Sequence, residues 1–186
     1  EIIKEFMINP QYWWAKGLGW WRSLMGHTRG INALAITSDD LIVTASNDHT
    51  ARVWNPAGEW LETLTGHTDW IQALAITSDN LIVTASSDRT ARVWRLRNSE
   101  ERARSLGGNC LQTLTGHTDW IQALAITSDD LIVTASDDHT ARVWNLAGEC
   151  LQTLTGHTSN VCAVAITSNN LIVTASWDGT AMVWNL

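Results

Sequence analysis

The sequence has little proline, tyrosine, phenylalanine and cysteine. Its 186 residues include two prolines, one tyrosine, one phenylalanine and three cysteines, against twelve tryptophans. No stretch approaches the roughly 18 consecutive apolar residues that a membrane-spanning helix requires. Residues 1–9 lack the charged and apolar regions of a secretion signal. We therefore expect no membrane partner and no secretion.

The chain also lacks an excess of positive charge. It carries 12 Lys and Arg against 19 Asp and Glu, which gives a formal net charge of −7. Binding to nucleic acid normally requires a basic patch on the surface. The composition therefore predicts no nucleic-acid partner.

Self-similarity is the strongest signal in the sequence. The triplet Gly-His-Thr occurs at 26–28, 66–68, 116–118 and 156–158, and a tryptophan follows each His 27 residues later. Residues 61–94 and 111–144 align without gaps and differ at four of 34 positions. Such closeness is typical of recent duplication or deliberate construction. Repeats of this length must be recognised before any other structure is predicted.

Each repeat has the pattern of four short strands. In the third repeat we expect strands at 110–114, 121–127, 131–136 and 140–144, separated by turns rich in Asp, Ser and Gly. The middle strands carry apolar residues on both faces, which a sheet with one solvated face would not do. The sheets are therefore expected to stack against one another.

This repeat resembles the WD40 family, whose members build β-propeller blades from four antiparallel strands. The resemblance covers roughly residues 20–186, with repeats at 20–54, 60–94, 110–144 and 150–184. It implies an all-β propeller of four-stranded antiparallel blades, with four repeats in the chain. One departure is that the signature Asp after each Trp is absent; the residues there are Asn55, Arg95, Asn145 and Asn185.

The resemblance also implies a hydrogen-bonded tetrad in each blade. The four sets are His27, Thr44, Asp48 and Trp54; His67, Thr84, Asp88 and Trp94; His117, Thr134, Asp138 and Trp144; and His157, Thr174, Asp178 and Trp184. A His, an Asp and a hydroxyl also occur in hydrolases. Because the same set occurs four times and ends on a tryptophan, we interpret it as a structural latch, and we expect no catalytic residues.

Two features of the repeats predict how a ring closes. The resemblance implies that a first strand at about 20–25 is the outer strand of a preceding blade, while the strand ending at Trp184 has no outer strand after it. The blade faces carry small side chains, which suit the narrow wedge of a seven- or eight-bladed ring. They include Ala73, Ala75, Ala85, Ala91 and Val93.

Four such blades make half a ring, so a two-fold symmetric dimer would complete eight blades and exchange the outer strand. The rival interpretations are a fragment of a longer propeller and a compact four-bladed monomer.

Two segments stand outside the repeat. Residues 1–19 are a non-repeat segment, with a docking strap, the tail of another domain and a disordered leader as the alternatives. Residues 95–109 form an inserted loop in which Ser99 to Leu106 is typical of a capped helical turn. We expect either a partner-binding loop or a tolerated surface loop.

The resemblance to the WD40 family also implies partner binding on the face formed by the Gly-His loops and the turns at the tetrad Asp. Tryptophan beside mixed charge is typical of a binding hot spot. The leading candidates are Trp70, Trp120 and Trp177, accompanied by Arg29, Asp69, Arg89, Asp119 and Asp137. The alternative is that Trp70 and Trp120 pack over the neighbouring blade.

Metal and disulfide chemistry receive little support. His49 and His139 lie beside tetrad aspartates but in different blades, so no metal site and no cofactor are expected. Cys110 and Cys150 occupy equivalent places in neighbouring sheets about 10 Å apart, beyond the Cα separation of about 7 Å that a disulfide can bridge. With Cys162 they are expected to be free thiols, as in a reducing, cytoplasmic location.

The sequence therefore predicts a non-enzymatic scaffold that self-associates into a closed propeller and binds a protein or peptide on its loop face. The alternative is a purely architectural repeat protein, amplified or designed, whose only activity is self-assembly.

Overall fold

The computed structural model describes residues 22–97 and 109–185, and within them the chain is all-β. Fifteen strands form four antiparallel sheets, three with four strands and one with three. The all-β fold class expected from the sequence is confirmed. The strap proposed for residues 1–19 and the helical turn proposed at Ser99 to Leu106 lie outside the described residues.

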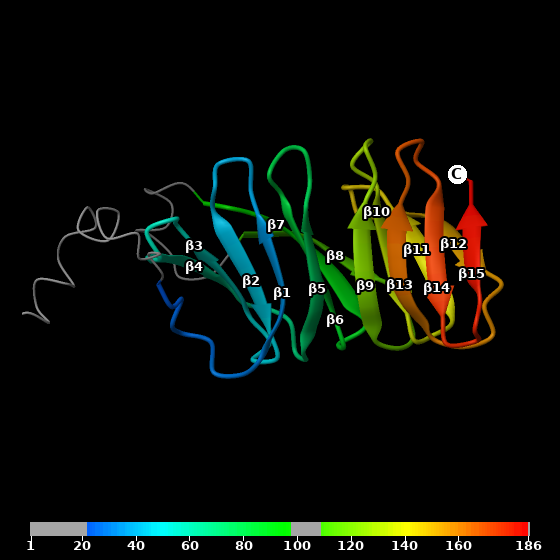
Figure 1. Ribbon diagram of the computed structural model, residues 1–186, viewed down its shortest axis with the longest axis horizontal. Coiled ribbons are helices and arrows are strands. Elements are labelled where there is room, and N and C mark those ends of the chain that lie inside the picture. Colours follow the sequence, from blue (N-terminus) through cyan, green and yellow to red (C-terminus); the bar gives the residue numbers. More distant parts are fainter. Residues whose placement is uncertain (1–21, 98–108, 186) are drawn as a thin grey trace, which may run out of the picture.

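The sheets follow one another along the chain as simple meanders (Figure 1). The first comprises β1 (Ile31–Ile36), β2 (Ile42–Ser46), β3 (Ala51–Trp54) and β4 (Trp60–Leu64). The second comprises β5 (Ile71–Ile76), β6 (Ile82–Ser86), β7 (Thr90–Arg95) and β8 (Asn109–Thr115). The third comprises β9 (Ile121–Ile126), β10 (Ile132–Ser136), β11 (Thr140–Trp144) and β12 (Cys150–Thr155). The fourth comprises β13 (Val161–Ile166), β14 (Ile172–Ser176) and β15 (Ala181–Trp184).

Short turns fix the register of these meanders. At the turn between the first two strands of each sheet, the last residue has a left-handed backbone with φ between 58° and 61°. Asp and Asn tolerate this conformation better than other non-glycine residues. They occupy all four positions, namely Asp40, Asn80, Asp130 and Asn170.

The segment before the first Gly-His differs from the prediction. Residues 22–25 are not in a strand, although the sequence predicts one at about 20–25. They lie instead beside the turn that joins β3 to β4, where the Arg22 guanidinium donates a hydrogen bond to the Ala57 carbonyl oxygen. A strand forms only against a neighbouring edge, and in the described residues the unpaired edge of the three-stranded sheet, β15, lies at the far end of the row (Figure 1).

The hydrophobic core lies between successive sheets, so the second and third sheets are buried on both faces. We call the residues that contact the following sheet the forward face and those that contact the preceding sheet the rear face. In the first sheet the forward face comprises Val43, Ala45, Ala51 and Val53. It packs against a rear face of the second sheet that includes Ile71, Leu74, Ile76 and Ile82. Equivalent residues pack in the next two interfaces, so one contact is repeated three times.

Candidate functional site

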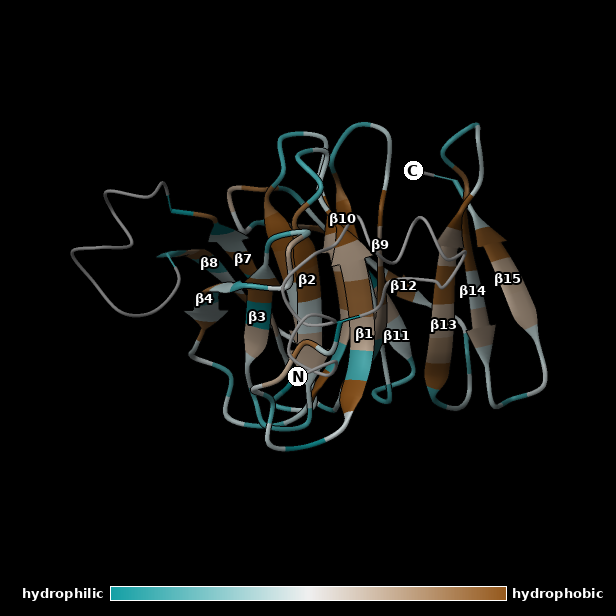
Figure 2. Ribbon diagram, turned by 60° about the vertical axis from the view of Figure 1, so that its left-hand side comes forward, coloured by the Kyte–Doolittle hydropathy of each residue, from teal (hydrophilic) through white to brown (hydrophobic). Residues whose placement is uncertain are grey.

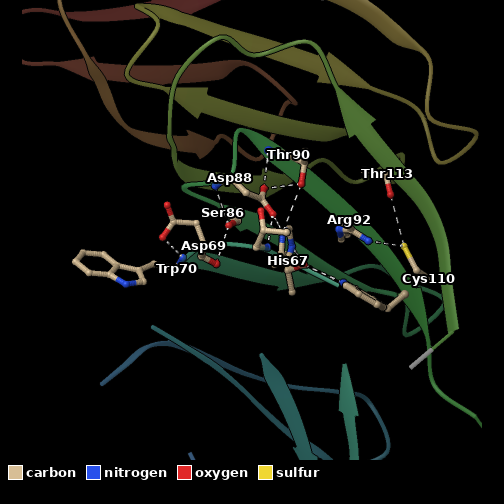
Figure 3. A network of polar contacts seen from close by, with 12 residues as sticks. His67, Asp69, Trp70, Ser86, Asp88, Thr90, Arg92, Cys110 and Thr113 are labelled. Atoms are coloured by element: carbon tan, nitrogen blue, oxygen red, sulfur yellow. Dashed lines mark hydrogen bonds and ion pairs between the residues drawn. The ribbon is translucent and has the colours of Figure 1, made fainter. Parts of the chain in front are cut away.

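Each blade contains a network of polar side chains, and Figure 3 shows His67, Asp88 and Thr90 of the network in the second blade. His67 Nδ1 lies 2.7 Å from an Asp88 carboxylate oxygen, and His67 Nε2 lies 2.8 Å from the Thr84 hydroxyl. Trp94 Nε1 donates to the same hydroxyl at 2.9 Å. Because an ionised carboxylate only accepts, Nδ1 carries the proton, and the Thr84 hydroxyl donates to Nε2.

The structure brings together the four members of every tetrad in the same way. The His to Asp distances in the other three blades are 2.8, 2.7 and 2.8 Å, and the Trp to Thr distances are 2.9, 2.9 and 2.8 Å. Each Asp also accepts from two backbone amides and a Thr hydroxyl; in the second blade these come from Thr68 and Thr90. Every buried partner is therefore satisfied, as a favourable polar network requires.

The protonation states follow from these contacts. Burial on its own would raise the pKa of Asp88, but the hydrogen bonds from His67, Thr90 and Thr68 outweigh it and hold that pKa well below its usual range. Burial lowers the pKa of His67, although the Asp88 carboxylate opposes this. At neutral pH the blade therefore holds an ionised Asp88 and a neutral His67.

The hydroxyl of the tetrad lies inside the blade. The Thr84 side chain is fully buried and already bonded to both His67 and Trp94. A nucleophile must be able to reach a substrate and needs a site that stabilises the developing oxyanion. The buried hydroxyl cannot meet the first requirement.

The Gly-His loop and the turn at the tetrad Asp lie side by side in each blade. Backbone hydrogen bonds of 2.9 to 3.0 Å join them, for example from Ser87 N to Trp70 O and from Trp177 N to Asn160 O. We call the surface formed by these loops the loop face. It contains every residue that the sequence nominates for partner binding.

The structure brings Trp70 and Trp120 together across neighbouring blades. Their ring centroids lie 6.4 Å apart at an interplanar angle of 49°, and they remain 38% and 42% exposed. The carboxylates of Asp69 and Asp119 accept from the backbone amides of the adjacent tryptophans at 2.7 and 2.8 Å. The pair is therefore both a packing contact between blades and an accessible aromatic surface.

The other nominated residues differ in how near they lie to this pair: the Asp137 backbone amide donates to the Trp120 carbonyl oxygen at 2.9 Å, whereas Trp177 belongs to the fourth blade. Trp177 is 71% exposed, and in the described residues its ring contacts no other aromatic ring. Arg29 and Arg89 are exposed at the surface. Asp137 accepts from Gln122 Nε2 at 2.8 Å through one oxygen, while its other carboxylate oxygen is buried without a hydrogen-bond partner.

Comparison with known proteins agrees with this geometry. The family described as WD domain, G-beta repeat matches the chain at 21–55, 58–95, 108–145 and 148–185. The chain belongs to the WD40-repeat family. Among solved structures it is similar to the computationally designed Ika4 protein, with a TM-score of 0.76 and 32% sequence identity. That match covers 88% of this chain and 96% of the other. No curated protein sequence matches the chain.

The two ends of the WD40 array expose faces that are buried at every internal interface. On the rear face of the first blade, Ile31, Leu34 and Ile36 are 48%, 67% and 60% exposed, whereas Ile71 of the second blade is 1% exposed. On the forward face of the fourth blade, Val183 is 65% exposed. Figure 2 colours much of β1 and β15 as hydrophobic. Two apolar sheet faces thus remain open to solvent.

The sequence did not predict one contact between blades, which we call the turn clamp. The Asn80 side chain accepts from Ser38 N of the preceding blade at 2.9 Å and donates to the Ser38 hydroxyl at 2.6 Å. Asn170 holds Ser128 in the same way, at 3.2 and 2.7 Å. The sequence signal was a Ser followed two residues later by Asp or Asn in every repeat, which turn formation alone already explains.

No group of three or more His, Cys, Asp or Glu among residues 22–97 and 109–185 is placed to hold a metal ion. In the same residues no helix is long and apolar enough to cross a membrane. Cys110, Cys150 and Cys162 are free thiols.

Proposed function

We propose that this chain is an interaction scaffold that closes a propeller with a second copy of itself and binds a protein or peptide on its loop face. The observation that carries the proposal is the pair of open apolar faces at the ends of the array. Contiguous exposed apolar surface of this kind marks an interaction site.

The two open faces are complementary to each other. At each internal interface a forward face of Val and Ala side chains packs against a rear face of Ile and Leu side chains. The fourth blade carries the same forward residues, which are Val173, Ala175, Ala181 and Val183. The first blade carries the same rear residues, which are Ile31, Leu34, Ile36 and Ile42. A second copy therefore offers each open face the partner that it has elsewhere in the chain.

The fourth blade also has a free strand edge. In the described residues its sheet has three strands, and β15 has no neighbour on its outer side. In the other blades this neighbour contributes a buried leucine two residues before Gly-His, namely Leu64, Leu114 or Leu154. Leu24 holds the same position before the first Gly-His. We propose that the segment around Leu24 of one copy pairs with β15 of the other.

Such a head-to-tail contact gives a closed ring when the rotation between copies completes a full turn. Two copies of four blades make eight, which agrees with the small side chains on the blade faces. Each large apolar side chain that becomes fully buried contributes about 1.5–3 kcal/mol. Several are covered at each of the two junctions, so the ring is expected to be stable.

The solution mass tests the ring. One chain has a mass of 20.6 kDa, and we expect a species of twice that mass at micromolar concentration. Val183→Asp places a charge on the forward face and should give the monomer. Leu151→Asp is the matched control, because Leu151 is 53% exposed on β12 and lies outside both open faces.

A mass of one chain at all concentrations would refute the ring, and would leave a compact monomer or coverage of the faces by further repeats. A mass above two chains would refute closure by two copies.

Partner binding is tested with the loop-face tryptophans. We propose that Trp70, Trp120 and Trp177 anchor a peptide, since exposed tryptophan carries much of the energy of protein interfaces. Peptides selected from a random library on the native protein should lose binding to the triple alanine variant, whose solution mass should remain that of the native protein.

If no selected peptide depends on these residues, the purely architectural function is favoured, and the similarity to a computationally designed protein supports that function. We also propose a reducing, cytoplasmic location, which the free thiols support.

A further inference from the structure

The turn clamp is present at all three internal interfaces. Asn80 holds Ser38, Asp130 holds Ser78, and Asn170 holds Ser128. In each case the acceptor has a left-handed backbone and lies in the blade that follows the serine. The clamp is thus a regular part of the interface, formed at the end of the first strand of each blade.

Each end of the array carries one half of this clamp. Asp40 has the same left-handed backbone, with φ of 61°, but no serine of a preceding blade lies before it. Ser168 is the equivalent of Ser38, Ser78 and Ser128, but no following blade supplies its acceptor. Within the described residues neither side chain has a hydrogen-bond partner, and Asp40 is exposed where its three counterparts are half-buried.

We propose that Asp40 of one copy accepts hydrogen bonds from the backbone amide and the hydroxyl of Ser168 of a second copy. This inference rests on the proposed head-to-tail ring and names a polar contact that fixes its register. Asp130 provides the precedent, since its two carboxylate oxygens accept from Ser78 N at 2.9 Å and from the Ser78 hydroxyl. Hydrogen bonds to an ionised carboxylate are stronger than neutral ones.

The clamp adds specificity that the apolar faces lack. Flat faces of Val, Ala, Ile and Leu can slide past one another, because apolar contacts have no preferred direction. A contact with two hydrogen bonds at one turn fixes the position of one blade relative to the next along the direction of their strands. It also distinguishes the end of the fourth blade from the start of the first, so it favours the head-to-tail arrangement.

The dissociation constant of the dimer tests the clamp. Asp40→Gly keeps the left-handed backbone and removes the acceptor. We expect it to weaken each junction about tenfold, and a ring with two junctions about a hundredfold. Asp40→Asn should restore most of the affinity, because Asn80 and Asn170 perform the same role.

Asp79→Gly is the matched control, since Asp79 is an exposed carboxylate in the equivalent turn inside the chain and has no hydrogen-bond partner among the described residues. The dissociation constant of the Asp79→Gly dimer should equal that of the native protein.

Coupling between the two residues provides the second measurement. Ser168→Ala removes only the hydroxyl donor and should weaken the dimer less than Asp40→Gly. Added to Asp40→Gly, it should have no further effect, because the acceptor is already gone. Circular dichroism should show that all variants stay folded.

A native dimer with an unchanged dissociation constant in Asp40→Gly, or with additive effects of the two substitutions, would overturn the clamp and leave the ring standing. A native protein that is monomeric throughout would overturn both.

Discussion

Removal of a single hydroxyl from a tetrad should destabilise the fold more than its size suggests. In the third blade the Thr134 hydroxyl bonds His117 Nε2 at 2.8 Å and accepts from Trp144 Nε1 at 2.9 Å. The Thr134 side chain is fully buried and that of Trp144 is 2% exposed. Thr134→Val keeps the shape but leaves both nitrogens without a partner, in a place that water does not reach.

The magnitude follows from those two orphaned groups. Each buried polar group without a partner costs about 1–3 kcal/mol. Replacing the buried hydroxyl by a methyl removes the cost of desolvating the hydroxyl, which offsets roughly 1 kcal/mol of this loss. With the middle of that range for each of the two groups and the offset subtracted, we expect the free energy of unfolding to fall by about 3 kcal/mol, a large share of the roughly 5–15 kcal/mol that stabilises a typical domain. Thr134→Ser keeps the hydroxyl, loses one methyl and should cost only about 1 kcal/mol.

Urea unfolding followed by tryptophan fluorescence measures the difference. With a slope of about 2 kcal/mol per molar, Thr134→Val should move the midpoint down by about 1–2 M, and Thr134→Ser by about 0.5 M. If Thr134→Val and Thr134→Ser have the same urea midpoint, the tetrad does not stabilise the blade through its hydrogen bonds. That result would refute the structural interpretation of all four tetrads.

Three further predictions concern pH and single positions. The folded pKa of His67 lies below its ordinary value of 6.5, so the stability that it contributes is present above pH 6.5 and is lost as pH falls below that value. The stability contributed by Asp88, whose folded pKa lies well below 3.8, begins to be lost only under about pH 4. The thermal midpoint measured from pH 8 to 3 should therefore fall below pH 6.5 and begin a second decline near pH 4; a constant midpoint would contradict both. Gly179→Ala should cost about 1 kcal/mol in urea unfolding, because φ is 85° there and no neighbouring atom lies within 4 Å of the added methyl; no loss would contradict backbone strain as the cause. Arg92→Met should leave stability within about 1 kcal/mol, since the Arg92 Nε is buried without a partner and Met182 occupies the equivalent place; a larger loss would mean that its stacking on tryptophan dominates.

Much of the fold was predictable because local signals repeat. The strands predicted at 110–114 and 140–144 appear as β8 and β11, with at most one residue of difference at each end. Turn residues mark those boundaries in the sequence itself. The members of the tetrads could also be located from the sequence, because the spacing between His and Trp is constant. The hydrogen bond between His and Thr is present in every blade.

The features that were predicted wrongly or not predicted depend on contacts between residues that are far apart in the sequence. The segment at 20–25 has the pattern of a strand, yet residues 22–25 pair with none, because a strand forms only against an edge that lies nearby. The turn clamp was missed since Asn80 already has a sufficient role in its own turn, and its serine lies 42 residues earlier. The sequence offers packing over the neighbouring blade as one role of Trp70 and Trp120, but only the structure shows that the two rings contact each other while remaining 38% and 42% exposed.

The repetition of one interface has a consequence for how the array tolerates rearrangement. Because the forward face of any blade fits the rear face of any other, neither face identifies its neighbour in the native order. A circularly permuted chain that starts at the second blade would expose the rear face around Ile71 and the forward face around Val53 at its two ends. These faces carry the same kinds of apolar side chain as the two faces that are exposed in the native order. Gain or loss of a whole repeat would likewise leave every remaining junction matched. The blades behave as interchangeable units, and the number that closes a circle is then set by the wedge of each blade rather than by its position in the chain.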